Sequence, residues 1–189
     1  MARRVKGGKS GGGGKGLATS RLAEAINQQI GNEMHASLQY VSIAAHFDGE
    51  DLPQLAAFFY RQAEEEREHA MKFVHFLIDV DAPVRVPAVG APKSEFATAA
   101  EAVALSLDWE RTVTEQIYRL VDIAREDRNY IAQRFLDWFV SEQLEEIRTM
   151  STLLALVERA GEDQLLYVEE TLAREKLGQG GGGEAAAAE

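Results

Sequence analysis

Apolar residues recur every three or four positions through most of the chain, the spacing that places them on one face of an α-helix. The pattern predicts four long helices, over about 20–48, 51–80, 98–126 and, after Asp127, up to the residue before Gly161. A shorter fifth helix is predicted from about Asp163 to Leu177, with Gly178 as its stop. The fold class predicted from this pattern is all-α.

Start and stop signals flank these segments. Thr19 or Ser20 can cap the first helix, which we expect to stop at Gly49. Pro53 is acceptable in the first turn of the second helix, and Thr98 with Glu101 forms a capping-box pattern for the third.

The longest connection lies between the second and third helices and contains Pro83, Pro87 and Pro92. About 17 extended residues span ~50 Å, whereas a helix of about 28 residues is only ~42 Å long. The connection can therefore cross the whole bundle and make the second and third helices parallel, while the short links make antiparallel neighbours. The prediction is a four-helix bundle with one long crossover.

Each apolar stripe is interrupted near its midpoint by a carboxylate or carboxamide. Because midpoints meet at one level whichever way a helix runs, the interruptions should share one layer of the core. The interrupting residues are Glu33, Glu66, Glu110, Gln143 and Glu146.

Four buried carboxylates need counter-charge, because each would otherwise cost several kcal/mol. No Lys or Arg lies on the stripes, and the chain has no Cys. Two divalent cations would balance four carboxylates, and the i, i+3 pair Glu66 and His69 adds an imidazole on the same helix face. Oxygen ligands with one imidazole suit iron or manganese. The alternative is a bundle whose acids face water, as most of the run from Glu64 to Glu68 must.

These residues bring a family resemblance into view. Around Asn32-Glu33, Gln39-Tyr40, Asp51-Leu52-Pro53, the run 64–70, Trp109-Glu110 and the run 142–146, the chain resembles bacterial non-haem ferritins, particularly those of actinobacteria. The resemblance covers roughly residues 18–177 in unbroken order. It implies a ferritin-like four-helix bundle with a short fifth helix.

The resemblance also implies roles for individual residues. Glu33, Glu66 and His69 would hold one iron, with Glu66 bridging to a second iron held by Glu110 and Glu146. Gln143 would lie beside the oxygen-binding side of the pair. A third, accessory iron would use Glu65, Glu142, Glu145 and Glu146. Tyr40 and Trp138 match aromatic residues next to the site, and core packing is the alternative reading for both.

Haem is not expected. In the related bacterioferritins, a methionine just after the bridging glutamate binds haem, and here that position is Arg67. That family also has a second Glu-x-x-His, where this chain has Gln143 and Glu146. The missing second histidine also argues against oxidases of the ribonucleotide-reductase and rubrerythrin types.

The ends of the chain differ from its centre in composition. Residues 1–17 and 178–189 are Gly-rich and are predicted to be flexible tails around one domain at 18–177. The first 16 residues carry five basic residues and no acid, although the net charge of the whole chain is −11. Weak binding of DNA or another polyanion by this tail is one interpretation, and a solvated tail without a partner is the favoured one. Without a membrane span or signal peptide, we expect a cytoplasmic protein.

Three functions remain to be compared. The resemblance implies iron storage in a homo-oligomeric cage of 24 subunits, with dioxygen or hydrogen peroxide as oxidant. A di-iron oxidase acting on an organic substrate should lack the fifth helix and the cage. A nucleoid-binding miniferritin-like protein should place its iron site between subunits.

Overall fold

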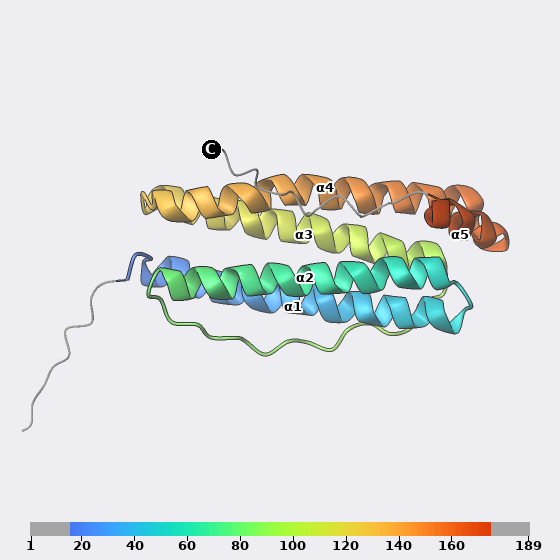
Figure 1. The fold of residues 1–189 in the computed structure, drawn as a ribbon, viewed down its shortest axis with the longest axis horizontal. Helices are drawn as coiled ribbons and strands as arrows, with labels where there is room; N and C mark the ends of the chain where they lie inside the picture. Colours follow the sequence, from blue (N-terminus) through green and yellow to red (C-terminus); the bar gives the residue numbers. More distant parts are fainter. Residues whose placement is uncertain (1–15, 175–189) are drawn as a thin grey trace, which may run out of the picture.

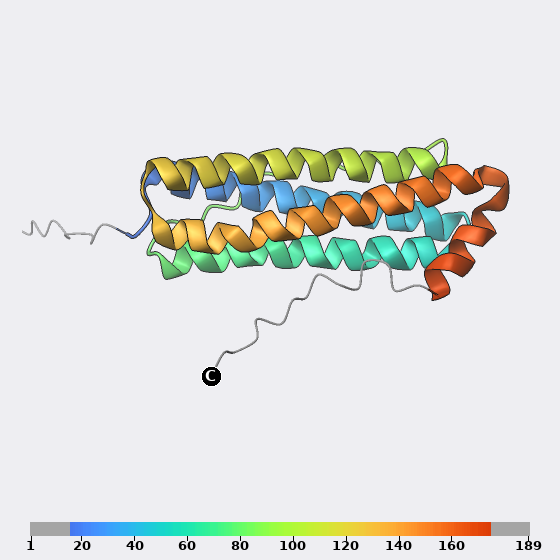
Figure 2. The same ribbon diagram turned by 90° about the horizontal axis from the view of Figure 1, so that it is seen from above.

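The computed structural model describes residues 16–174, which form an all-helical bundle without a strand in that range. The long helices are α1 (Ser20–Gly49), α2 (Pro53–Asp79), α3 (Ala99–Glu126) and α4 (Tyr130–Ala160). They lie side by side (Figure 1), and a 3-10 turn (η1, Glu162–Gln164) leads into α5 (Leu165–Arg174), which folds back across one end (Figure 2). The predicted fold class is confirmed. The predicted tails, with the polyanion-binding interpretation of the first, lie outside the described residues except for Gly16 and Leu17.

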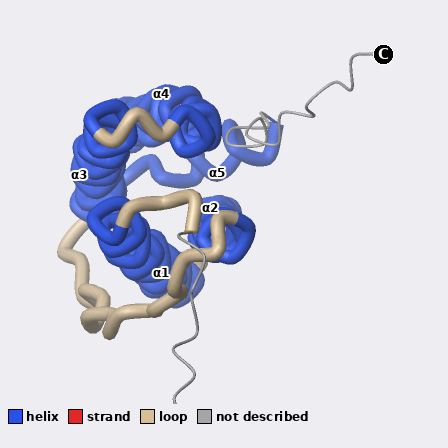
Figure 3. The backbone as a smooth tube through the Cα atoms, turned by 90° about the vertical axis from the view of Figure 1, so that its left-hand side faces the viewer, coloured by secondary structure: helices blue, strands red, loops and turns tan. Residues whose placement is uncertain are grey.

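The crossover between α2 and α3 runs the length of the bundle beside α1, so α2 and α3 are parallel as predicted (Figures 1 and 3). Two buried amides of α1 hold it. The Asn27 side chain donates to the Pro83 carbonyl at 2.8 Å and accepts from the Arg85 amide, and Gln39 both donates to and accepts from the Lys93 backbone. The proline-rich segment is therefore attached at both ends of its path.

Several helix ends differ from the prediction by a few residues. Gly49 is the last residue of α1 rather than its stop, and Asp51 takes a left-handed φ of 57°, so that α2 begins at Pro53. A left-handed φ of 51° at Arg128 also separates α3 from α4, which begins at Tyr130. Positive φ interrupts a right-handed helix, so these turns set the boundaries.

The predicted caps are mostly present. Thr19 accepts from the Leu22 amide at the start of α1, and Thr98 accepts from the Glu101 amide at the start of α3. The Glu101 carboxylate accepts from the Ala97 amide rather than from Thr98, so the capping box is only half formed.

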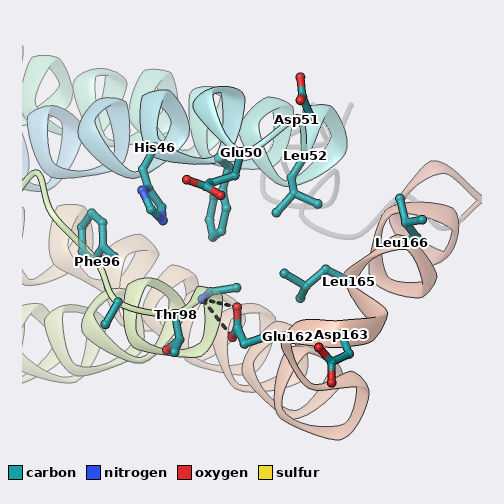
Figure 4. Close-up of a pocket in the computed structure, with 13 residues that line it drawn as sticks. His46, Glu50, Asp51, Leu52, Phe96, Thr98, Glu162, Asp163, Leu165 and Leu166 are labelled. Carbon is teal, nitrogen blue, oxygen red and sulfur yellow. Dashed lines mark hydrogen bonds between the residues drawn. The ribbon is translucent and has the colours of Figure 1, made fainter.

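Acidic side chains near α5 cap the helices that start at this end of the bundle. Glu169 accepts from the amides of Gln54 and Leu55 at 2.8 Å each, in a helix N-terminus that has no cap of its own. Glu162 accepts from the Ala99 amide at the start of α3, beside a pocket near His46 (Figure 4). Because α2 and α3 are parallel, both positive helix ends face the returning chain, which stabilises these carboxylates.

Glu169→Ala is expected to lower the thermal unfolding midpoint by about 4–8 °C. The substitution leaves the buried Leu55 N–H and the partly buried Gln54 N–H without acceptors, at a cost of about 2 kcal/mol. Calorimetry of this variant beside Glu170→Ala, an exposed acid of the same helix, measures the effect. Equal midpoints for both variants would show that Glu169 does not hold α5 in place.

No helix in residues 16–174 has the length and apolar character required to cross a membrane.

Candidate metal centre

The apolar core is divided into two clusters, one toward each end of the bundle. One contains Phe47 and Phe59, and the other contains Phe73 and Phe139, with Trp109 packed against both. Between them lies the polar layer predicted from the stripes. The stripes of the four predicted helices consist of positions 26, 30, 33, 37, 40, 44 and 47; then 55, 59, 62, 66, 69, 73, 76 and 80; then 103, 107, 110, 114, 117, 121 and 124; and then 136, 139, 143, 146, 150, 153 and 157. All of these positions are buried except Ser37 and Val121, which are half-buried. The layer contains the predicted interrupting residues together with His69: Glu33, Glu66, His69, Glu110, Gln143 and Glu146.

Glu33, Glu66 and His69 form the first candidate ligand group. One ligand atom from each lies within 4.8 Å of the others, and all three side chains are buried. The His69 Nδ1 atom is 3.3 Å from Glu66 Oε2, and the Gln29 amide donates to Glu33 Oε1 at 2.9 Å. The structure therefore brings together the three residues that the resemblance implies for the first iron.

Glu65, His69, Glu142 and Glu146 form a second group with ligand atoms within the same 4.8 Å. This group differs from the predicted accessory position, because it contains His69 and lacks the exposed Glu145. His69 belongs to both groups and so lies between them.

Glu145 nevertheless lies close to this second group. Burial raises the pKa of both Glu65 and Glu142, and the charge of Glu145 raises them further. The Glu145 charge therefore acts on the acids of the group, although Glu145 contributes no ligand atom to it.

Glu110 belongs to neither group. The Tyr40 hydroxyl donates to one of its oxygens. Gln143 lies beside it, where its side-chain amide accepts from the Thr114 hydroxyl at 2.9 Å. Glu110 and Glu146, which the resemblance pairs on the second iron, therefore lie in the same layer without forming one ligand group in the described residues.

Three carboxylate oxygens of this layer are buried without a hydrogen-bond partner. They are Glu33 Oε2, Glu66 Oε1 and Glu110 Oε2. A buried acceptor without a partner costs about 1–3 kcal/mol, and more if it is charged. Cations bound in the layer would give these oxygens partners, and carboxylates with one imidazole are the donors that iron accepts.

The raised pKa values of the buried carboxyl groups also bear on cation binding. Burial raises the pKa of Glu33 and Glu66 well above the usual value, and neighbouring carboxylates add to the rise. Burial likewise raises the pKa of Glu110 to about 7, although the Tyr40 hydrogen bond opposes it, and raises that of Glu146 well above normal. Cations must displace protons from such a cluster, so binding should release protons.

Amide and aromatic side chains contact several of the candidate metal-binding residues. Gln62 donates to Glu65 at 3.1 Å and to Glu146 at 3.3 Å. Trp138 packs edge-on against His69 with ring centroids 5.4 Å apart, so it lies next to the site as the resemblance implies. The contact of Gln29 with Glu33 was not predicted from the sequence, although two residues four apart on one helix are neighbours and could have indicated it.

Comparison with known proteins places these residues in context. The model of the ferritin-like domain family matches residues 23–160. The chain is similar to ferritin BfrB of Mycolicibacterium smegmatis, with 45% identity over 87% of this chain and 91% of the relative. It is 37% identical to a bacterial non-heme ferritin of Staphylococcus aureus, over 84% of this chain and 97% of the relative. An open pore ferritin from the archaeon Archaeoglobus fulgidus superposes with a TM-score of 0.81 at 30% identity, over 84% of this chain and 98% of that one.

Proposed function

Because the chain belongs to the ferritin family, we propose that it oxidises Fe(II) at a di-iron centre inside the bundle and stores the ferric product in a cage of 24 identical subunits. Iron is the substrate and the stored cargo. Each pair of Fe(II) ions gives up two electrons and becomes Fe(III). With two protons, these electrons reduce one dioxygen to hydrogen peroxide, or one hydrogen peroxide to two water molecules. The proposal includes no haem.

The three buried carboxylate oxygens without partners carry this proposal. They come from α1, α2 and α3, so the bundle itself supplies the site, and folding alone leaves the oxygens unsatisfied. An organic substrate would need a cavity beside them, whereas metal ions need only the oxygens and the imidazole.

The residues of the layer then have separate tasks. Glu33, Glu66 and His69 hold the first Fe(II), with Glu66 bridging to the second. Glu110 and Glu146 hold the second ion, and Gln143 faces the oxidant. Gln29 and Gln62 orient two of the carboxylates through the hydrogen bonds described above. The apolar clusters on both sides limit access of water to the ions.

Anaerobic Fe(II) titration followed by exposure to oxygen tests the activity. We expect tight binding of two Fe(II) ions per subunit, rapid oxidation on exposure, and growth of a mineral core. Size-exclusion chromatography tests the cage separately, because 24 subunits of 20.8 kDa elute far from a monomer or dimer. A small particle that oxidises Fe(II) would instead favour a di-iron oxidase.

The second ligand group supports an accessory iron position at the edge of the layer, formed by Glu65, Glu142 and Glu146 with Glu145 nearby. Glu65→Ala combined with Glu142→Ala is expected to change iron stoichiometry and turnover while sparing the first fast round of oxidation. Both residues lie outside the stripes that hold the pair. Stopped-flow oxidation with two and then with many Fe(II) ions per subunit separates the phases. A complete loss of the first phase would contradict the division into a pair and an accessory position.

A further inference from the structure

Lys72 is a half-buried cation on α2, one helical turn after His69 and two turns after Glu65. Its Nζ atom lies 4.3 Å from the centre of the Trp138 ring on α4. Trp138 in turn packs against His69, so the lysine lies next to the second ligand group without being part of it. Within residues 16–174, no carboxylate lies within ion-pairing distance of the Lys72 Nζ atom.

The charge of Lys72 nevertheless acts on the accessory acids. Burial raises the pKa of both Glu65 and Glu142, and the lysine charge opposes that rise in both. A cation that stabilises ionised carboxylates also repels a metal ion bound to them. The Lys72 charge therefore favours ionisation of the metal-free carboxylates but disfavours a metal ion bound to them.

The contact with Trp138 explains how the lysine can lie beside the acids without blocking them. A lysine over a tryptophan ring is attracted to its face by about 0.5–2 kcal/mol. The ring therefore competes with the carboxylates for the ammonium group. The ligand atoms of Glu65, Glu142 and Glu146 remain free to hold a metal ion.

We propose that Lys72, held over Trp138, is a positioning residue that selectively lowers the metal affinity of the accessory position, so that ions bound there dissociate instead of being retained. The proposal rests on the accessory position of the proposed function. It deepens that function by assigning the control of metal retention to one charge outside the ligand set. All three side chains of the first ligand group are buried, and Lys72 is not among the main causes of the pKa shifts of Glu33 and Glu66, so its charge should act less on that group.

Mn(II) binding to the metal-free, assembled full-length protein tests this inference without oxidation. Free Mn(II) is measured by its electron paramagnetic resonance signal during an anaerobic titration. Lys72→Met should raise the affinity for the third ion roughly tenfold, the effect of one charge several ångströms from a divalent ion in a partly solvated site. The affinity for the first two ions should change by less than about twofold, and Lys72→Arg should behave like the wild type.

Lys93→Met is the matched control, because it removes the same charge from a lysine of the crossover, which pairs with Glu101 of α3. Tighter binding in Lys72→Met alone supports the inference. Unchanged third-ion binding in Lys72→Met, or an equal gain in Lys93→Met, overturns it while leaving the accessory position intact. If neither the wild type nor Lys72→Met binds a third ion, the accessory position itself is wrong, and the inference falls with it.

Discussion

Glu66→Ala is expected to slow the rapid phase of Fe(II) oxidation by about 100-fold or more while the protein still folds and assembles. Substitutions of residues that only support metal ligands typically cost about 10–100-fold, and loss of a bridging ligand should exceed that range. Folding should survive, because the substitution removes a buried acid whose pKa is raised by burial and by the Glu110 charge.

Stopped-flow oxidation of Fe(II) measures the rate, and size-exclusion chromatography measures assembly. Glu68→Ala is the matched control, because it removes an exposed acid two residues along the same helix. Wild-type oxidation by an assembled Glu66→Ala protein would refute the site assignment. A variant that fails to assemble would instead show that Glu66 is needed for folding, against the burial argument.

The polar layer was predictable from sequence because helix period and helix length determine it. Glu33, Glu66 and Glu110 lie near the midpoints of apolar stripes, and helices packed side by side bring their midpoints to one level. Nearly all stripe positions are buried in the structure, so the period assigned every helix face correctly. The crossover was predictable from its length alone.

Contacts that depend on the path of the chain after the fourth helix were not predictable. Glu169 lies well over 100 residues from the α2 amides that it caps, and nothing in its local sequence distinguishes it from the exposed Glu170. The contact between Lys72 of α2 and Trp138 of α4 was not predictable either, because a contact between two helix surfaces depends on how each helix is rotated about its axis.

The accessory acids show where spacing alone fails. Glu145 lies three residues after Glu142 and one before Glu146, so helix spacing alone places it next to the face that Glu142 and Glu146 share. The run 142–146 contains three acids, and only Glu142 and Glu146 are buried and join the second ligand group, whereas Glu145 is exposed. A sequence match to the whole run cannot make this distinction, because it does not fix which neighbouring helix each face meets.

The metal-free layer should limit the stability of the protein. Replacing Glu33, Glu66 and Glu110 together by glutamine is therefore expected to raise the thermal midpoint of the metal-free protein at pH 7.5 by about 5–15 °C. Each glutamine keeps the shape of the side chain and removes a carboxyl group that burial makes costly to ionise.

The gain should depend on pH. Burial raises the pKa of all three folded-state carboxyls, so each acid binds its proton more tightly in the folded than in the unfolded protein. The loss of folding stability that these acids cause is therefore absent below the pKa of an unfolded Glu, near 4.5, and it grows as pH rises. For Glu110 it should reach its full size near pH 7, where its folded pKa lies. The advantage of the triple variant should be large at pH 7.5 and small at pH 5.

Calorimetry of the metal-free proteins at both pH values measures this difference. A second triple variant, with glutamine at the exposed acids Glu24, Glu68 and Glu115 of the same three helices, controls for the change in net charge. Adding Mn(II) should raise the midpoint of the wild type and of this control more than that of the buried variant, because the buried variant retains only the second ligand group. A buried variant that melts below the wild type at pH 7.5 would contradict the argument, since the carboxylates would then stabilise the fold without metal. The expected result would mean that the buried carboxylates lower the stability of the metal-free bundle, and that bound cations offset this cost.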